Sequence, residues 1–135
     1  MELKGTGGGY TLSRFALVEK YGQEIVTNSS NATIIASETV EGWSASNLLL
    51  NTMPPDPYSA WYTATTKDPV FLTIELHENK KIEELRIVSN AYTHPYRVND
   101  FKFYGSRNGI EWHLIKEVVG ANAPNDRSWV SFDLR

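Results

Sequence analysis

Apolar and polar residues alternate over several short stretches in the second half of the chain. The clearest is 70–76, with the sequence Val-Phe-Leu-Thr-Ile-Glu-Leu, and similar β-branched or aromatic stretches occupy 85–88, 101–104, 112–119 and 129–134. Successive side chains of a strand point to opposite faces of its sheet. Each stretch therefore predicts a half-buried β-strand.

Residues with turn chemistry separate these stretches at 77–80, 90–99, 106–109 and 120–126. Asn108-Gly109 is the dipeptide that a tight hairpin favours, because such a turn requires φ > 0. Many short strands without a long helical pattern predict an all-β fold, an antiparallel β-sandwich or barrel.

The N-terminal region differs from the rest of the chain. Residues 1–13 hold four of the nine glycines, and a glycine-rich segment loses much entropy on ordering, so we expect a flexible arm. Apolar residues at 15–26 partly fit a helical stripe, although Gly22 interrupts it. We expect residues 1–30 to be an arm or attachment segment, and residues 31–135 to form the sandwich.

The alternation also predicts which side chains form the core. They are Phe71 or Leu72, Ile74, Leu85, Ile87, Phe101, Phe103, Trp112 and Leu114, with Trp61 also favoured for core packing over ligand contact.

The composition limits the classes of partner. A chain of 135 residues can bury one core without a metal or disulfide, and the absence of cysteine excludes a disulfide framework and thiolate chemistry. Thirteen Lys and Arg against 16 Asp and Glu give a net charge of −3, with the signs interspersed. We therefore expect no nucleic-acid partner.

Membrane targeting is absent from the pattern. No apolar stretch approaches the roughly 20 residues that span a bilayer, and the N-terminus lacks the apolar region of a signal peptide. The Met53-Pro54-Pro55 loop lacks the basic neighbours of a lipid-binding spike. We expect synthesis in the cytoplasm without a signal peptide and no membrane insertion, with release to a virion or to the extracellular space as one possible route.

Catalytic motifs are also absent. The three histidines, His77, His94 and His113, lack metal-ligand spacing, and the serines lack a Gly-x-Ser-x-Gly elbow. Glu83-Glu84 and Asp56 form no recognisable acid–base pair. We expect a protein that is not an enzyme.

Three stretches occur in an order that resembles the discoidin domain. They are Ala36-Ser37 with 46–49 and Trp61, then 69–76 with 85–87, and last Arg97 with 101–112. The third ends in Ser-Arg-Asn-Gly-Ile-Glu-Trp, similar to the family's Ser-x-Asp/Asn-Gly-x-x-Trp. This family is also called the coagulation-factor type C domain and, among sugar binders, the family 32 carbohydrate-binding module. The resemblance implies a galactose-binding-like jelly roll that binds ligands through its end loops.

The chain departs from that family at two places. Where relatives carry Asp-Gly and help to cage a structural calcium, this chain has Leu50-Asn51, so the carboxylate is missing. We expect no cofactor, and calcium only if carbonyl oxygens and other loops rebuild its site. The family's last strand, an Arg-Tyr-Val-Arg-like run with a following Glu, is either absent or supplied by the N-terminal region.

One loop carries the chemistry of a sugar site. The candidate ligand-binding residues are Tyr92, His94, Tyr96, Arg97 and Asn99, together with Trp43 in a separate Gly- and Ser-flanked loop. An aromatic ring can cover the C–H face of a pyranose, while Arg, His and Asn side chains hydrogen-bond its hydroxyls.

A purely structural role for this loop stays open. Tyr92 and Tyr96 would then pack beneath the loop, Pro95 would stiffen it, and Arg97 would form a surface ion pair worth little. For Trp43, contact with a ligand or partner and the absence of such contact are equally open.

Two functions remain. The first is a non-catalytic carbohydrate-binding module that recognises a galactose-type or related hexose on cell surfaces, attached through its N-terminal segment to a larger assembly such as a phage or phage-like particle. The second is a structural or decoration protein that binds protein subunits rather than sugar.

Overall fold

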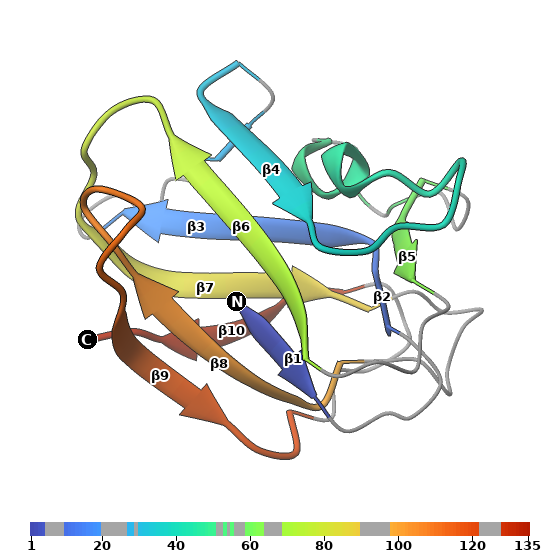
Figure 1. The fold of residues 1–135 in the computed structure, drawn as a ribbon. Coiled ribbons are helices and arrows are strands. Elements are labelled where there is room, and N and C mark those ends of the chain that lie inside the picture. The colour runs from blue at the N-terminus through green and yellow to red at the C-terminus, as the bar shows by residue number, and fades with distance from the viewer. Residues whose placement is uncertain are drawn as a thin grey trace.

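The computed structural model describes residues 1–4, 10–19, 27–28, 30–50, 53, 55, 59–63, 69–89, 98–121 and 128–135. These residues form the strands β1 (Glu2–Lys4), β2 (Tyr10–Leu12), β3 (Arg14–Glu19), β4 (Ala32–Ala36), β5 (Trp61–Thr63), β6 (Val70–Leu76), β7 (Ile82–Val88), β8 (Asp100–Gly105), β9 (His113–Val118) and β10 (Val130–Asp133), and the short 3-10 helix η1 (Ala45–Leu49). The predicted all-β class is confirmed (Figure 1).

The strands form antiparallel sheets stacked as a sandwich. A five-stranded sheet has the order β4-β6-β1-β8-β9, a three-stranded sheet the order β10-β7-β3, and β2 pairs with β5. In Figure 1 the five-stranded sheet lies in front of the three-stranded one. The predicted antiparallel β-sandwich is confirmed.

The core lies between these two sheets and is built from cross-strand rows. In the larger sheet, Leu3 of β1 lies opposite both Val70 and Phe101, and all three side chains are buried. In the smaller sheet, Ile87 lies between Phe15 and Val130. Buried apolar area of this kind is the main favourable contribution to folding.

The described parts of the N-terminal region form strands of the sandwich, whereas the expected division at residue 30 stays a prediction. Strand β1 lies inside the five-stranded sheet, and β3 pairs with β7. Ala16 and Val18 are buried as well as Phe15 and Leu17, so both faces of β3 are buried. The sequence therefore lacks the alternation of apolar and polar residues that would have predicted this strand. Residues 5–9, which hold the four glycines, lie outside the described residues.

Most of the predicted core is buried, but two residues are not. Leu72, Leu85, Ile87, Phe101, Phe103 and Trp61 are buried, and Ile74 packs against them. Trp112 and Leu114 were predicted wrongly, because their exposed fractions are 48% and 53%.

A β-bulge accounts for the exposure of Leu114. Phe103 pairs with Lys116, whereas the next residue, Tyr104, pairs with Leu114, so Ile115 is an extra residue in β9. Because neighbouring residues of a strand face opposite sides, the bulge turns Leu114 to the face that carries Tyr104.

Replacing Ile87 by aspartate should abolish cooperative folding. The change removes about 2 kcal/mol of burial and leaves an unpaired charge in the core, a combined loss that exceeds a typical free energy of unfolding. Thermal melting followed by circular dichroism measures this. The matched control is Ile35→Asp, at a side chain 62% exposed, which should cost about 1 kcal/mol or less. Equal melting curves for the two variants would contradict the proposed core.

The Met1 amine makes stability depend on pH in a polypeptide that starts at this residue. The amine donates to the carbonyl of Leu72 at 2.8 Å, and burial lowers its pKa from 8.0 to about 6, although the Glu2 charge acts in the opposite direction. The folded state therefore favours the neutral amine. Its contribution is complete above pH 8, declines as the pH falls towards 6, and amounts to about 2 kcal/mol. Urea unfolding at pH 6 and pH 8 should show this loss, whereas the N-acetylated chain should lack it. A loss of equal size in both chains would contradict the assignment.

Candidate functional site

The predicted binding loop joins two strands at one end of the sandwich. Strand β7 ends at Val88 and β8 begins at Asp100. Figure 1 shows the end of β7 at the side of the molecule where β2, β5 and η1 also lie, here called the loop end. Tyr92, His94, Tyr96 and Arg97 lie outside the described residues, and their role stays a prediction. Trp43 and Asn99 are described.

Trp43 lies in the turn between β4 and η1 and packs against a second aromatic ring. Its backbone N–H donates to Val40 at 2.9 Å, and Gly42 has φ of 86°, which a residue with a Cβ rarely adopts. The ring of Trp43 meets that of Tyr62 edge to face, with centroids 6.1 Å apart. Both side chains are half-buried, so the pair contributes aromatic surface to the loop end. Sequence reasoning missed Tyr62. Its place next to Trp61, which was expected in the core, could have indicated a side chain on the opposite, outward face.

Backbone and side-chain hydrogen bonds fix this turn to β5. Val40 donates to the carbonyl of Tyr62 at 2.8 Å, and Tyr62 donates to that of Trp43 at 3.3 Å. The side-chain amide of Asn47 in η1 donates to the carbonyl of Ala60 at 3.0 Å. The aromatic pair is therefore held by several contacts rather than by its own packing alone.

A buried arginine ties three segments together beneath the loop end. Arg14, at the start of β3, has an exposed fraction of 0%. Its Nη1 donates to the carbonyl oxygens of Ser13 and Ser59, each at 2.6 Å, and of Asn47 at 3.2 Å. Charge-assisted hydrogen bonds offset the cost of burying the guanidinium. Sequence reasoning missed Arg14 because it stands at the edge of a run that was interpreted as a partial helix.

The expectation about the structural calcium stays a prediction, because Asn51, beside the position where relatives carry the acid, lies outside the described residues. Within the described ranges, no group of three or more His, Asp or Glu side chains is placed to hold a metal ion. The carbonyls of Asn47 and Ser59, on either side of the position where relatives carry the acid, accept hydrogen bonds from Arg14. A hard cation needs several oxygen ligands, and these two carbonyls already accept hydrogen bonds from a guanidinium.

Asn99 contributes a polar atom at the same end. Its backbone carbonyl accepts from the N–H of Ala121 at 2.9 Å, which holds it beside the start of β8. Its Oδ1 is buried and has no hydrogen-bond partner among the described residues, and the same holds for the hydroxyls of Ser13 and Ser89. Buried oxygens of this kind are normally satisfied by water, ligand or neighbouring loops, so the loop end has hydrogen-bonding capacity to offer.

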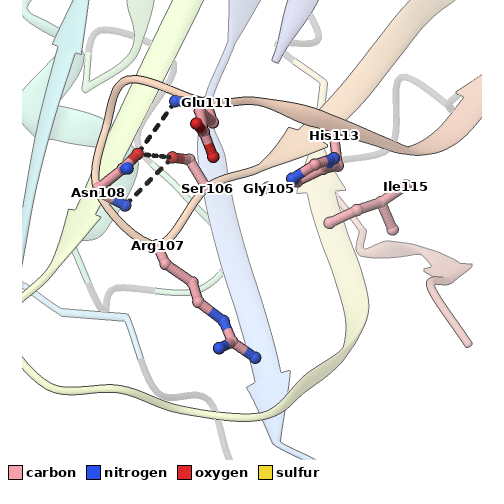
Figure 2. A pocket seen from close by; sticks show the side chains of 7 residues that line it. All are labelled: Gly105, Ser106, Arg107, Asn108, Glu111, His113 and Ile115. Carbon is pink, nitrogen blue, oxygen red and sulfur yellow. Dashed lines mark hydrogen bonds between the residues drawn. The ribbon is translucent and has the colours of Figure 1, made fainter.

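A separate hollow lies beside the β8–β9 hairpin, and sequence reasoning gave no sign of it. Its volume is about 350 Å³, and Figure 2 shows the residues that line it, Gly105, Ser106, Arg107, Asn108, Glu111, His113 and Ile115. Gly109 has φ of 73°, as predicted, but the connection between β8 and β9 spans residues 106–112 and is longer than the expected tight hairpin. Asn108 Oδ1 accepts from the backbone N–H groups of Ile110 at 2.9 Å and Glu111 at 3.0 Å, which makes the turn self-supporting.

The shifted carboxylates lie on the smaller sheet, where they form surface pairs. A side-chain hydrogen bond from Arg86 lowers the pKa of Glu84, and one from Arg135 lowers the pKa of Asp133. Both groups are therefore ionised at neutral pH, unlike a general acid, whose pKa is raised. No helix in the described ranges is long and apolar enough to cross a membrane.

Residues 27–135 match the family model of the F5/8 type C domain. Neither a curated protein nor a solved structure gives a significant match to the chain. The matched range includes Trp43, Asn99 and the hairpin hollow, whereas β1, β2 and β3 precede it.

Replacing Arg14 by methionine should lower the free energy of unfolding by about 2–4 kcal/mol, because a side chain of similar length leaves buried carbonyls without a donor. Urea unfolding measures the loss, and Lys81→Met, at an exposed position, is the control.

In the unsubstituted protein, EDTA should leave the melting temperature unchanged, because the carbonyls of Asn47 and Ser59 already accept hydrogen bonds from Arg14. Destabilisation by EDTA that calcium reverses would show instead that a metal site exists.

Proposed function

The chain belongs to the F5/8 type C domain family, whose members are generally non-catalytic binding domains, and we propose that it binds a hexose of cell-surface glycans through its loop end. This role involves no catalytic step. The fold holds the loops at fixed positions, and binding residues commonly lie on such loops.

The observation that carries the proposal is the Trp43–Tyr62 pair. Two half-buried aromatic rings meet at the loop end, and backbone hydrogen bonds tie the turn that carries Trp43 to β5, which carries Tyr62. A fixed aromatic surface suits the C–H face of a pyranose, because it loses little conformational entropy when the sugar binds.

The polar part of the site is proposed from the adjoining loop. Arg97 and His94 would donate to sugar hydroxyls, and Tyr92 or Tyr96 would add a second stacking surface. Asn99 supports this arrangement, because its buried Oδ1 has no partner among the described residues and can accept a hydrogen bond from a sugar hydroxyl.

Several copies acting together would supply the strength that one shallow site lacks. A millimolar affinity corresponds to only about −4 kcal/mol, whereas linked sites bind together far more tightly. We propose display on a larger assembly, such as a phage or phage-like particle made in the cytoplasm and released to meet glycans. Nucleic acid and the membrane interior are not part of the proposed role.

The test uses Arg97→Ala and Trp43→Ala on immobilised galactose-type glycan. Each change should reduce retention at least tenfold, because a charge-assisted hydrogen bond or a stacked ring contributes about 1.5 kcal/mol or more. Lys81→Ala is the matched control. For Arg97→Ala the melting temperature should stay unchanged, which separates a binding residue from one that structures the loop. Full retention by both variants would contradict the proposal.

A second function, binding of protein subunits, is favoured by one specific observation. Five of the exposed large apolar side chains cluster along β9 and its turns, Ile110, Trp112, Leu114, Ile115 and Val119. Strand β9 is at the edge of its sheet, and exposed apolar edges commonly mark contact sites. Light scattering decides between the functions. A monomer that retains glycan supports the first, and an oligomer that ignores glycan supports the second.

A further inference from the structure

The hairpin hollow lies away from the loop end and has features of its own. Figure 1 shows β8 starting near the loop end and leading across the sheet to the β8–β9 hairpin. None of the residues proposed to bind a hexose lines the hollow. A ligand in the hollow would therefore occupy a second site.

The floor of the hollow is apolar and depends on the β-bulge. Ile115 is the extra residue of β9, and its Cδ1 lies 2.7 Å from the position that a Cβ on Gly105 would take. A glycine at 105 therefore admits Ile115 to the floor. The side chain of Ile115 remains 44% exposed, so it offers apolar surface to a ligand.

Three of the residues that line the hollow carry exposed ionisable side chains. Arg107, Glu111 and His113 all line the hollow. Figure 2 shows Arg107 and Glu111 extending to different sides of the turn, with His113 next to Ile115 on β9. No hydrogen bond or ion pair links these three side chains to each other or to other described residues. Ser106 and Asn108, in contrast, already hydrogen-bond within the turn.

These groups favour a ligand with three features. The guanidinium of Arg107 presents the planar fork that matches a carboxylate, and the carboxylate of Glu111 accepts hydrogen bonds from hydroxyls. Ile115 suits an aliphatic C–H surface. Glu111 repels a doubly charged phosphate more strongly than a singly charged carboxylate, because the repulsion between like charges grows with the charge of the ligand. A pyranose that bears a carboxylate combines all three features in one small molecule, and the hollow of about 350 Å³ lies in the range of small-molecule sites.

We propose that the hairpin hollow is a second binding site, and that its ligand is an acidic sugar held by Arg107, Glu111 and Ile115. This site does not depend on the hexose site at the loop end. A chain with both sites would contact an acidic glycan at two places, which raises the overall affinity when both contacts form together.

The test titrates the ¹⁵N-labelled full chain with glucuronate and, as the matched neutral ligand, with glucose. Glucuronate should shift the amide signals of residues 105–115 with a millimolar dissociation constant, and glucose should not. Arg107→Gln should weaken glucuronate binding at least tenfold, because it removes a charge-assisted hydrogen bond. Lys81→Gln, which removes a positive charge elsewhere on the surface, should leave binding unchanged.

Three results would overturn the proposal: equal shifts with glucose, no shifts at residues 105–115, or full binding by Arg107→Gln. The titration of the unsubstituted chain needs no variant, so it decides the first two even if a variant fails to fold. Arg97→Ala distinguishes the two sites. It should reduce glycan retention at the loop end at least tenfold and leave the glucuronate shifts at residues 105–115 intact.

Discussion

The five-stranded sheet is continuous only because β1 lies between β6 and β8. Without this strand, β4-β6 and β8-β9 would be two separate pairs, since their only connection within the described sheet runs through Glu2, Leu3 and Lys4. Leu3 fills the row between Val70 and Phe101 at the centre of the core. A three-residue strand thus joins segments that are distant in sequence.

Arg14 has the corresponding role between the smaller sheet and the loop end. Strand β3 packs against β7 in the core, and its first residue extends a guanidinium to the carbonyls of Asn47 and Ser59. These hydrogen bonds hold η1, and the turn that carries Trp43, in a fixed position relative to β3 and its sheet. A buried cation with several carbonyl acceptors is directional, so it fixes loop geometry in a way that apolar packing alone does not.

The fold could be predicted from local pattern, but the N-terminal strands and the site could be predicted only in part. The alternation of apolar and polar residues predicts strands such as 70–76, and the turn residues Asn108-Gly109 predict the turn between β8 and β9. The pairing of β3 depends on contacts between residues about seventy positions apart, and its two buried faces leave no alternation to detect. Tyr62 and Arg14 were missed for a related reason, because their roles come from contacts with η1 and the Trp43 turn rather than from their neighbours in sequence.

The β-bulge in β9 accounts for the exposure of Leu114, contributes to the hairpin hollow and interrupts the ladder of an edge strand. One extra residue, Ile115, places Leu114 opposite Tyr104 instead of Gly105, and so moves an apolar side chain from the inner face to the outer one. The same residue lies over Gly105 and forms the floor of the hairpin hollow. A bulge also disrupts the regular ladder of an edge strand, which opposes edge-to-edge pairing with another chain. Exposed apolar surface and an interrupted ladder together favour contacts made by side chains at this edge, as a small ligand would make them, over extension of the sheet by a partner strand.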